Sequence, residues 1–91
     1  MDVEELLQRY AARERHFRGV NLIWVNLSGI NLSEINLTNT DLSQSNLVGG
    51  IKLRRANLRG VSLYQSGLLD ADLTEADLRD TILENTNIPS C

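Results

Sequence analysis

Residues 20–49 read VNLIW VNLSG INLSE INLTN TDLSQ SNLVG, six five-residue units with leucine at the third place of each. Beyond Gly50 the pattern resumes as IKLRR ANLRG VSLYQ SGLLD ADLTE ADLRD TILEN TNIPS, and RHFRG at residues 15–19 precedes the run. Fifteen units therefore cover residues 15–90. Their central column, position i, is the predicted structural core: Phe17, Leu22, Leu27, Leu32, Leu37, Leu42, Leu47, Leu53, Leu58, Leu63, Leu68, Leu73, Leu78, Leu83 and Ile88.

A repeat of five residues fits neither common secondary structure. In a helix, at about 100° per residue, five steps turn the next leucine by about 140°, so the leucines would spiral around the axis. In a strand, side chains alternate with a period of two, so successive leucines would lie on opposite faces. The period therefore predicts a solenoid whose backbone turns once in every five residues.

The columns beside the leucines agree with a turning backbone. Position i−2 holds small or β-branched residues in every unit except the first, where Arg15 stands. Position i+2 holds four of the six glycines, together with Asn39 and Asn85. Because glycine and asparagine tolerate positive φ, we expect position i+2 to form the corners.

The units resemble those of the pentapeptide-repeat family, whose pattern is A-(D/N)-L-x-x, most closely in ANLRG (56–60), ADLTE (71–75) and ADLRD (76–80). In that family four units form one square coil, and positions i and i−2 point inward. The resemblance implies an all-β solenoid, a right-handed quadrilateral β-helix of just under four coils. Small members of this kind are similar to proteins abundant in cyanobacteria.

Two segments follow from the repeat boundaries. Residues 1–14 are expected to form a capping α-helix, because Asp2 and Glu5 form a capping-box-like pair and the apolar residues after them share one helical face. We expect this helix over residues 3–13 to cover the first coil; a partner-binding helix is the alternative. Residues 15–90 are expected to form the β-helix, with the extra residue making a bulge near 49–50.

The C-terminal end has no comparable cover in the sequence. It reads Pro89-Ser90-Cys91, and one proline shields little apolar surface or backbone edge. This end is therefore expected to associate with a second copy, or to dock another repeat domain. Cys91 is expected to be a bystander thiol.

Several large apolar residues fall at outward positions and predict a contact surface. They are Ile23, Trp24, Val48, Tyr64, Leu69 and Ile82. For Trp24 the alternative is that it packs under the N-terminal helix or its linker. Residues one coil apart also stack charges. One column is a predicted charge ladder of Glu34, Arg55 and Glu75. A second column is a basic stripe of Arg18, Arg59 and Arg79 with Thr38 between the first two, interpreted as solvated charges or as an anion site.

Composition excludes several classes of protein. One cysteine and one histidine rule out a disulfide framework and a usual zinc site. No apolar run is long enough for a membrane span, and the polar, acidic N-terminus does not read as a signal peptide, so a cytoplasmic location is expected. The net charge of −3 argues against direct nucleic-acid binding. No catalytic constellation, metal site or cofactor motif is present, so no enzyme is predicted.

Function is therefore expected at the surface, as a non-enzymatic structural or protein-interaction module with an unknown protein partner. One alternative comes from the resemblance: some larger family members resemble duplex DNA and bind DNA gyrase. A rod of about 18 Å would need about 10 negative charges to match DNA, and the chain carries a net −3. The other alternative is a segment that extends or caps another repeat protein through its open C-terminal end.

Overall fold

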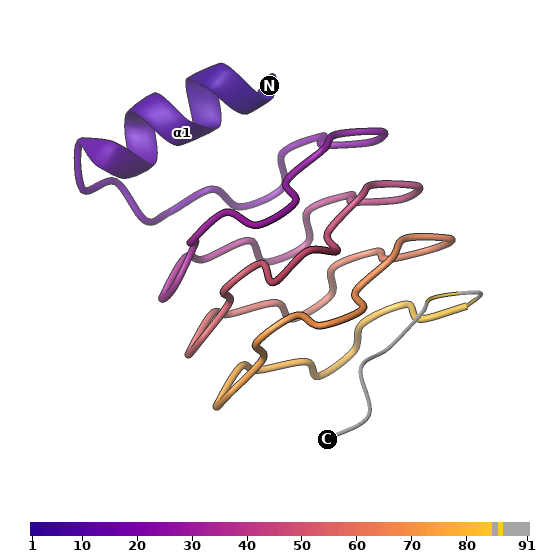
Figure 1. Cartoon of the computed structure of the whole chain (residues 1–91). Coiled ribbons are helices and arrows are strands. Elements are labelled where there is room, and N and C mark those ends of the chain that lie inside the picture. Colours follow the sequence, from indigo (N-terminus) through magenta and orange to yellow (C-terminus); the bar gives the residue numbers. More distant parts are fainter. Residues whose placement is uncertain (85, 87–91) are drawn as a thin grey trace.

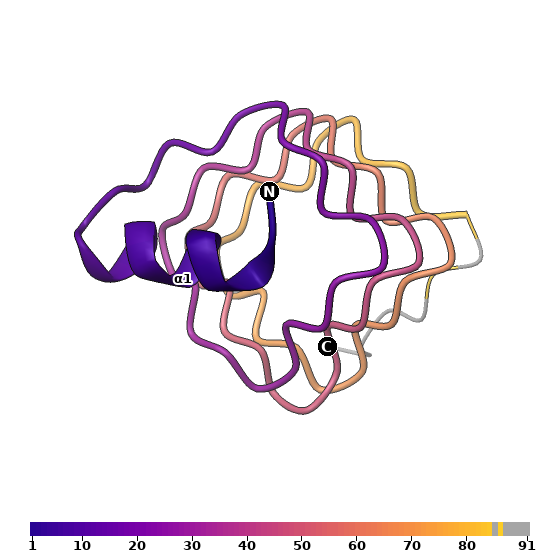
Figure 2. The ribbon, with the colours of Figure 1, turned by 90° about the horizontal axis from the view of Figure 1, so that it is seen from above.

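The computed structural model describes residues 1–84 and residue 86. In this part of the chain, α1 (Val3–Ala11) is the only helix, and the β-bridges are isolated and not joined into longer strands. After it the backbone winds into coils stacked one above another, a β-helical solenoid (Figure 1). Seen along the stack, the coils overlay one another and α1 crosses their N-terminal end (Figure 2).

Parallel bridges hold the coils together, and they fall on one repeat position. Each bridge joins two residues at position i−1 that are 20 or 21 apart, such as Asn21 with Asp41 and Asn31 with Lys52. Each contact is a reciprocal pair of hydrogen bonds: the Leu22 N–H donates to the Asp41 carbonyl at 2.8 Å, and the Asp41 N–H donates to the Val20 carbonyl at 3.1 Å. Four five-residue units therefore complete one turn.

The extra residue is absorbed at one corner. The spacing between bridged residues is 20 for Asn26 with Asn46 and becomes 21 for Asn31 with Lys52. Gly49 and Gly50 lie between these pairs with φ of 78° and 84°. Two successive positive φ values are accessible to glycine at little cost, so the ladder continues past the insertion without a break.

Each corner is a tight turn with the left-handed residue at position i+2. The Val25 N–H, for example, donates to the Leu22 carbonyl at 3.3 Å, and Trp24 between them has φ 68°. A positive φ at the third residue of such a turn is the mark of type II. The sequence predicted positive φ at position i+2, and the glycines there have it. Bulky residues at the same position also have positive φ, for example Glu34 at 65° and Arg55 at 59°.

Position i−1 has a structural role that the sequence analysis missed. In all nine described units with Asn or Asp there, the side-chain oxygen accepts a hydrogen bond from the backbone N–H of position i+1. Asn21 Oδ1, for instance, lies 3.0 Å from the Ile23 nitrogen. This Asx turn starts the corner and satisfies a donor that the ladder does not use. The regular Asn/Asp at i−1 was the available signal.

The core agrees with the predicted column over most of its length. Phe17 and the leucines from Leu22 to Leu68 are each at most 2% exposed. Hydroxyls at position i−2 are also buried but bonded: Ser45 and Ser66 each donate to a carbonyl three residues back at 2.6 Å. Burial of these hydroxyls therefore leaves no donor unpaired.

The prediction fails at the last described coil. Leu73 and Leu78 are only partly buried, and Leu83 is 36% exposed. Placing Leu83 in the core is therefore wrong for this structure, because no described coil lies below it to close the column. Ile88, also assigned to the core, lies outside the described residues.

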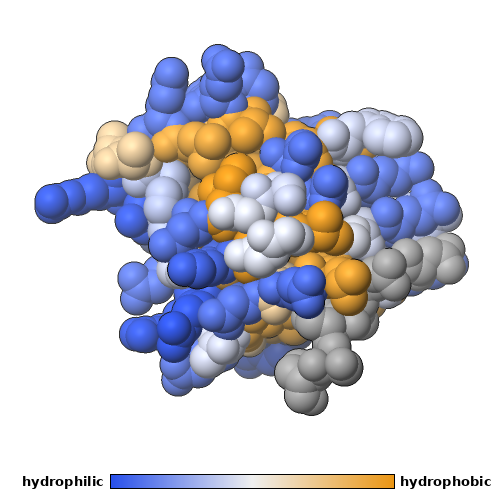
Figure 3. Space-filling view, viewed as in Figure 1, coloured by the Kyte–Doolittle hydropathy of each residue, from blue (hydrophilic) through white to orange (hydrophobic). Residues whose placement is uncertain are grey.

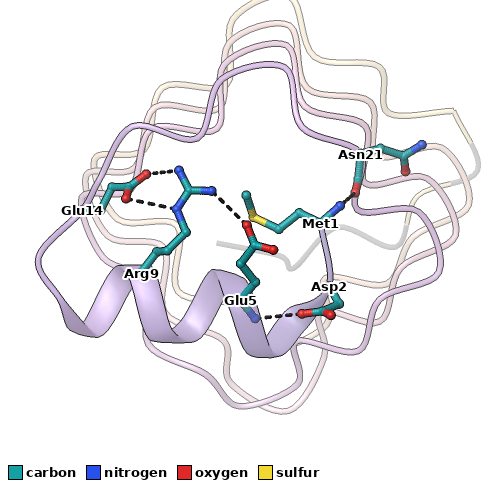
Figure 4. Close-up of polar contacts among 6 residues, drawn as sticks. All are labelled: Met1, Asp2, Glu5, Arg9, Glu14 and Asn21. Carbon is teal, nitrogen blue, oxygen red and sulfur yellow. Dashed lines mark hydrogen bonds and ion pairs between the residues drawn. The ribbon is translucent and has the colours of Figure 1, made fainter.

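The helix α1 begins at a side-chain cap and packs on the first coil. Asp2 Oδ1 accepts from the Glu5 N–H at 2.8 Å, and Arg9 forms ion pairs with Glu5 at 3.3 Å and with Glu14 (Figure 4). Leu6 has no exposed surface. The helix is two residues shorter than the predicted 3–13 because Arg13, with φ 73°, leaves the helical conformation.

Polar groups of the N-terminal segment bond carbonyls at the top of the stack. In lower coils, the carbonyls at i−1 and i+1 accept from the coil above. In the first coil, the Ser33 carbonyl instead accepts from the Tyr10 hydroxyl at 2.7 Å, and the Asn21 carbonyl lies 3.5 Å from the Met1 ammonium. The N-terminal segment thus contacts carbonyls of the first coil at positions that, in lower coils, accept from the coil above.

Candidate interaction surface

The solenoid brings together residues that are far apart in sequence. Bridges join Asn21 to Asp41, Asp41 to Ser62, and Ser62 to Ile82, so the units beginning at residues 20, 40, 61 and 81 share one face. This face carries Ile23, Trp24, Tyr64 and Ile82. Val48 and Leu69 stack on the adjoining face. We call these six residues the contact surface.

Most of the contact surface is open to solvent. Trp24 is 73% exposed, Leu69 56%, Ile82 51% and Tyr64 37%, whereas Ile23 and Val48 are half-buried. The alternative that Trp24 packs under the N-terminal helix is therefore wrong. Its corner has φ 68°. The same column continues in the next two coils with Gln44 and Gln65, whose side-chain amides bond each other at 2.8 Å.

The Val48–Leu69 part of the contact surface depends on a nearby glycine. A Cβ on Gly67 would lie 3.0 Å from Val48 Cγ1, closer than ordinary contact. Gly67 stands at position i−1, where nine other described units carry Asn or Asp. This unit therefore has no Asx turn, and the absence of a side chain leaves room for Val48. Figure 3 shows apolar side chains gathered below α1 on the face seen there, with hydrophilic side chains on either side.

Charged columns occupy another face. Arg55 lies 3.9 Å from Glu34 and 3.7 Å from Glu75, the predicted ladder, and Arg54 lies 3.8 Å from Asp72. All these side chains are more than a third exposed, so solvent screens the pairs and each adds little to stability. We assign these pairs to surface stability.

The three arginines of the basic stripe differ in their partners. Arg79 forms a two-point bond with Asp77, Nε to Oδ1 at 2.9 Å and Nη2 to Oδ2 at 2.7 Å. This bond from Arg79 lowers the pKa of Asp77 to about 2. Arg59 lies only within 4.0 Å of Asp80, and Arg18 has no ion pair or hydrogen bond with the described residues. Beside Arg18 and Arg59 the surface is hollowed.

Two classes of site find no support in the described residues. No group of three or more His, Cys, Asp or Glu side chains lies close enough to share a metal ion. The helix α1, with nine residues, is too short to cross a bilayer, and no other described segment offers a spanning helix.

Comparison with known proteins gives one family. The sequence model described as pentapeptide repeats (8 copies) matches residues 16–51 and 51–88. No curated protein matches the chain. Among solved structures, HetL from Nostoc sp. strain PCC 7120 is 35% identical with a TM-score of 0.53, and is described as involved in heterocyst differentiation regulation. The match covers 89% of this chain and 36% of HetL, so this chain spans about a third of that protein.

Two further solved pentapeptide-repeat proteins are similar at lower levels. The protein alr5209 from Nostoc PCC 7120 is 27% identical, with 98% of this chain and 86% of that chain covered and a TM-score of 0.44. Rfr23 from Cyanothece 51142 is 20% identical, with 93% and 97% covered and a TM-score of 0.35.

Proposed function

Because this chain belongs to the pentapeptide-repeat family, we propose that it is a non-enzymatic structural and protein-interaction module. Its frame is a right-handed quadrilateral β-helix of just under four coils over residues 15–90, with a bulge near 49–50. Parallel bridges 20 or 21 residues apart support the four-unit coil. The buried leucine column supports placing function outside the frame.

Residues 1–14 serve as a cap in this proposal. Burial of Leu6, the Tyr10 bond to the Ser33 carbonyl and the placement of Arg9 over the Phe17 ring at 4.9 Å support it. A partner-binding helix would need its apolar face free, and that face already packs on the first coil.

The observation that carries the proposed function is the exposure of Trp24, Tyr64, Leu69 and Ile82 on two adjoining faces. A large apolar side chain that becomes fully buried contributes about 1.5–3 kcal/mol. Trp and Tyr are also the residues most enriched at binding hot spots. A protein partner that covers this patch would therefore gain enough free energy to offset part of the cost of association.

Site-directed photo-cross-linking tests the contact surface. A benzophenone amino acid placed at Tyr64 is expected to give a discrete adduct in a cyanobacterial extract, and Trp24→Ala should weaken that adduct at least fivefold. The matched control carries the same amino acid at Arg54, which occupies the same repeat position on another face. Identical adducts from both positions, or an adduct unaffected by Trp24→Ala, would contradict the proposal.

A second candidate function is extension or capping of another repeat protein at the C-terminal end. In the described part of the chain, Ile82 and Leu83 are exposed, and the backbone N–H groups of Leu73 and Leu78 donate to no backbone carbonyl. Self-association through this end would appear in sedimentation velocity as a concentration-dependent dimer, and Leu83→Asp should abolish it. A monomer at millimolar concentration would exclude self-association.

Imitation of DNA toward gyrase receives no support from the dimensions and charge. The longest axis of the molecule is 32 Å. Duplex DNA of that length carries about 19 charges at one per about 1.7 Å, against a net −3 here. We therefore expect unchanged gyrase supercoiling in the presence of micromolar protein.

A further inference from the structure

The basic stripe encloses a hollow that has a simple steric origin. Arg18, Thr38 and Arg59 stand one above another at position i+1 of three successive coils. Because a short side chain lies between two long ones, the surface is hollowed there, with a volume of about 450 Å³. The lining is polar, and it is completed by Asn36, Asn39, Asn57, Gly60 and Asp80.

The floor of the hollow depends on Gly60. A Cβ at this position would lie 2.1 Å from Asn39 Oδ1, so only glycine allows the Asn39 amide to lie over it. Gly19, in the same column one coil above Asn39, has the same left-handed φ and nothing within 4 Å of a Cβ. Space at Gly60 is therefore filled by a polar amide.

The charges in the hollow leave one positive charge uncompensated. Two guanidinium groups, Arg18 and Arg59, face one carboxylate, Asp80, and two minus one is +1. Asp80 approaches Arg59 only to 4.0 Å, at the limit of an ion pair. Arg79, by contrast, is held by Asp77 through two short hydrogen bonds and is not among the lining residues.

We propose that this hollow binds a phosphate-class oxyanion between the guanidinium groups of Arg18 and Arg59. Two coil steps separate the arginine backbones by about 10 Å, and an arginine side chain is long enough for both groups to converge on one tetrahedral anion. Guanidinium groups bind phosphate oxygens through paired, charge-assisted hydrogen bonds. No aromatic side chain lines the hollow, so the phosphate group itself is the recognised part of the ligand.

Titration followed by ¹H–¹⁵N NMR tests the site. Inorganic phosphate and O-phosphoserine are the two probes, added at constant ionic strength, and glutarate tests whether a dicarboxylate suffices. We expect both phosphate probes to shift resonances of residues 18, 38–39 and 59–60 with a millimolar Kd. Binding of phosphoserine alone would assign the site to phosphate monoesters and still support it. Equal shifts from sodium chloride or glutarate would overturn the proposal.

Substitutions in both directions make the result decisive. Arg59→Ala and Arg18→Ala should each weaken phosphate binding at least tenfold, whereas Arg54→Ala, at the same repeat position on another face, should change Kd less than twofold. Asp80→Asn should tighten binding about threefold, because it removes one negative charge beside the anion in a water-like dielectric. Asp70→Asn is its matched control. Unchanged Kd in Arg59→Ala and in Asp80→Asn would refute the site.

Discussion

The two corner glycines of one column allow a direct measurement of what a left-handed corner costs. Gly19 and Gly60 have φ of 68° and 69° and occupy the same repeat position. A Cβ at Gly19 meets nothing within 4 Å, whereas a Cβ at Gly60 would lie 2.1 Å from Asn39 Oδ1. Alanine at Gly19 therefore introduces backbone strain alone, and alanine at Gly60 introduces the same strain together with displacement of the Asn39 amide.

The magnitudes follow from these differences. Left-handed backbone costs a non-glycine residue about 1–2 kcal/mol, and alanine recovers about 0.4–1 kcal/mol by restricting the unfolded chain. Gly19→Ala should thus lower the free energy of unfolding by about 1 kcal/mol. Gly60→Ala should lower it by about 2 kcal/mol, since forcing a side chain off its rotamer adds about 0.5–1.5 kcal/mol.

Urea unfolding followed by circular dichroism measures both free-energy losses. Thermal unfolding gives a second measurement, in which about 1 kcal/mol corresponds to a Tm change of about 4–8 °C for a chain of this size. Asn39→Ala removes the obstructing amide but adds strain of its own, because Asn39 has φ 60°. Measured against the Asn39→Ala single variant, Gly60→Ala should therefore cost only as much as Gly19→Ala does in the wild type. Equal destabilisation by Gly19→Ala and Gly60→Ala would refute the steric role assigned to Asn39.

Three further predictions concern the corner, the ion pair and the core. Asn26→Ala should lower the free energy of unfolding by about 1 kcal/mol, because the Ser28 N–H loses the side-chain oxygen 3.0 Å away; Asn26→Asp should retain stability, and equal loss in both would contradict an Asx role. Since the bond from Arg79 lowers the folded-state pKa of Asp77 from 3.8 to about 2, its contribution is fully present above pH 3.8 and is lost as pH falls toward 2. The stability difference between wild type and Asp77→Asn, measured by urea unfolding, should therefore shrink between pH 5 and pH 2, and a constant difference would argue against the pair. Leu63→Ala should lower the free energy of unfolding by about 2–5 kcal/mol because the side chain is 1% exposed. Leu83 lies one coil below and is 36% exposed, so Leu83→Ala should lower it by less than about 1 kcal/mol. Similar decreases in Tm for the two variants would place Leu83 in the core.

The five-residue period was sufficient to predict the solenoid and most of its core. Because a period of five fits neither a helix nor a strand, it predicted a backbone that turns once in every five residues. The buried positions from Phe17 to Leu68 follow the leucine column, as predicted. Leu83 departs from it because burial in a stack needs a coil on both sides, which a repeat pattern does not encode. The Asn and Asp residues at position i−1 were assigned no role from the sequence, although their regular recurrence at the start of each corner is typical of Asx turns.

The candidate surfaces were harder to predict from columns alone. Outward placement of Trp24 follows from the repeat, but only the structure decides between exposure and cover by α1. The basic stripe looks uniform in sequence, yet Arg79 is neutralised by Asp77 in its own unit while Arg18 and Arg59 flank a hollow. Such differences depend on side-chain lengths and partners, which stacking order does not specify.

The left-handed corners show that each unit has two kinds of residue. Some determine the backbone conformation, and others can change in identity while that conformation is kept. Of the thirteen described i+2 corners, nine carry a residue other than glycine, among them Trp, Glu, Gln, Arg and Asp. The backbone at these corners is thus set by the buried leucine and, in six of the nine, by an Asx oxygen, and not by the corner side chain. The side chains at positions i+1 and i+2 therefore form a regular array on the surface, in which each row belongs to one coil and each column to one face. Single substitutions at these outward positions can therefore change which partner the surface binds while the solenoid keeps its fold.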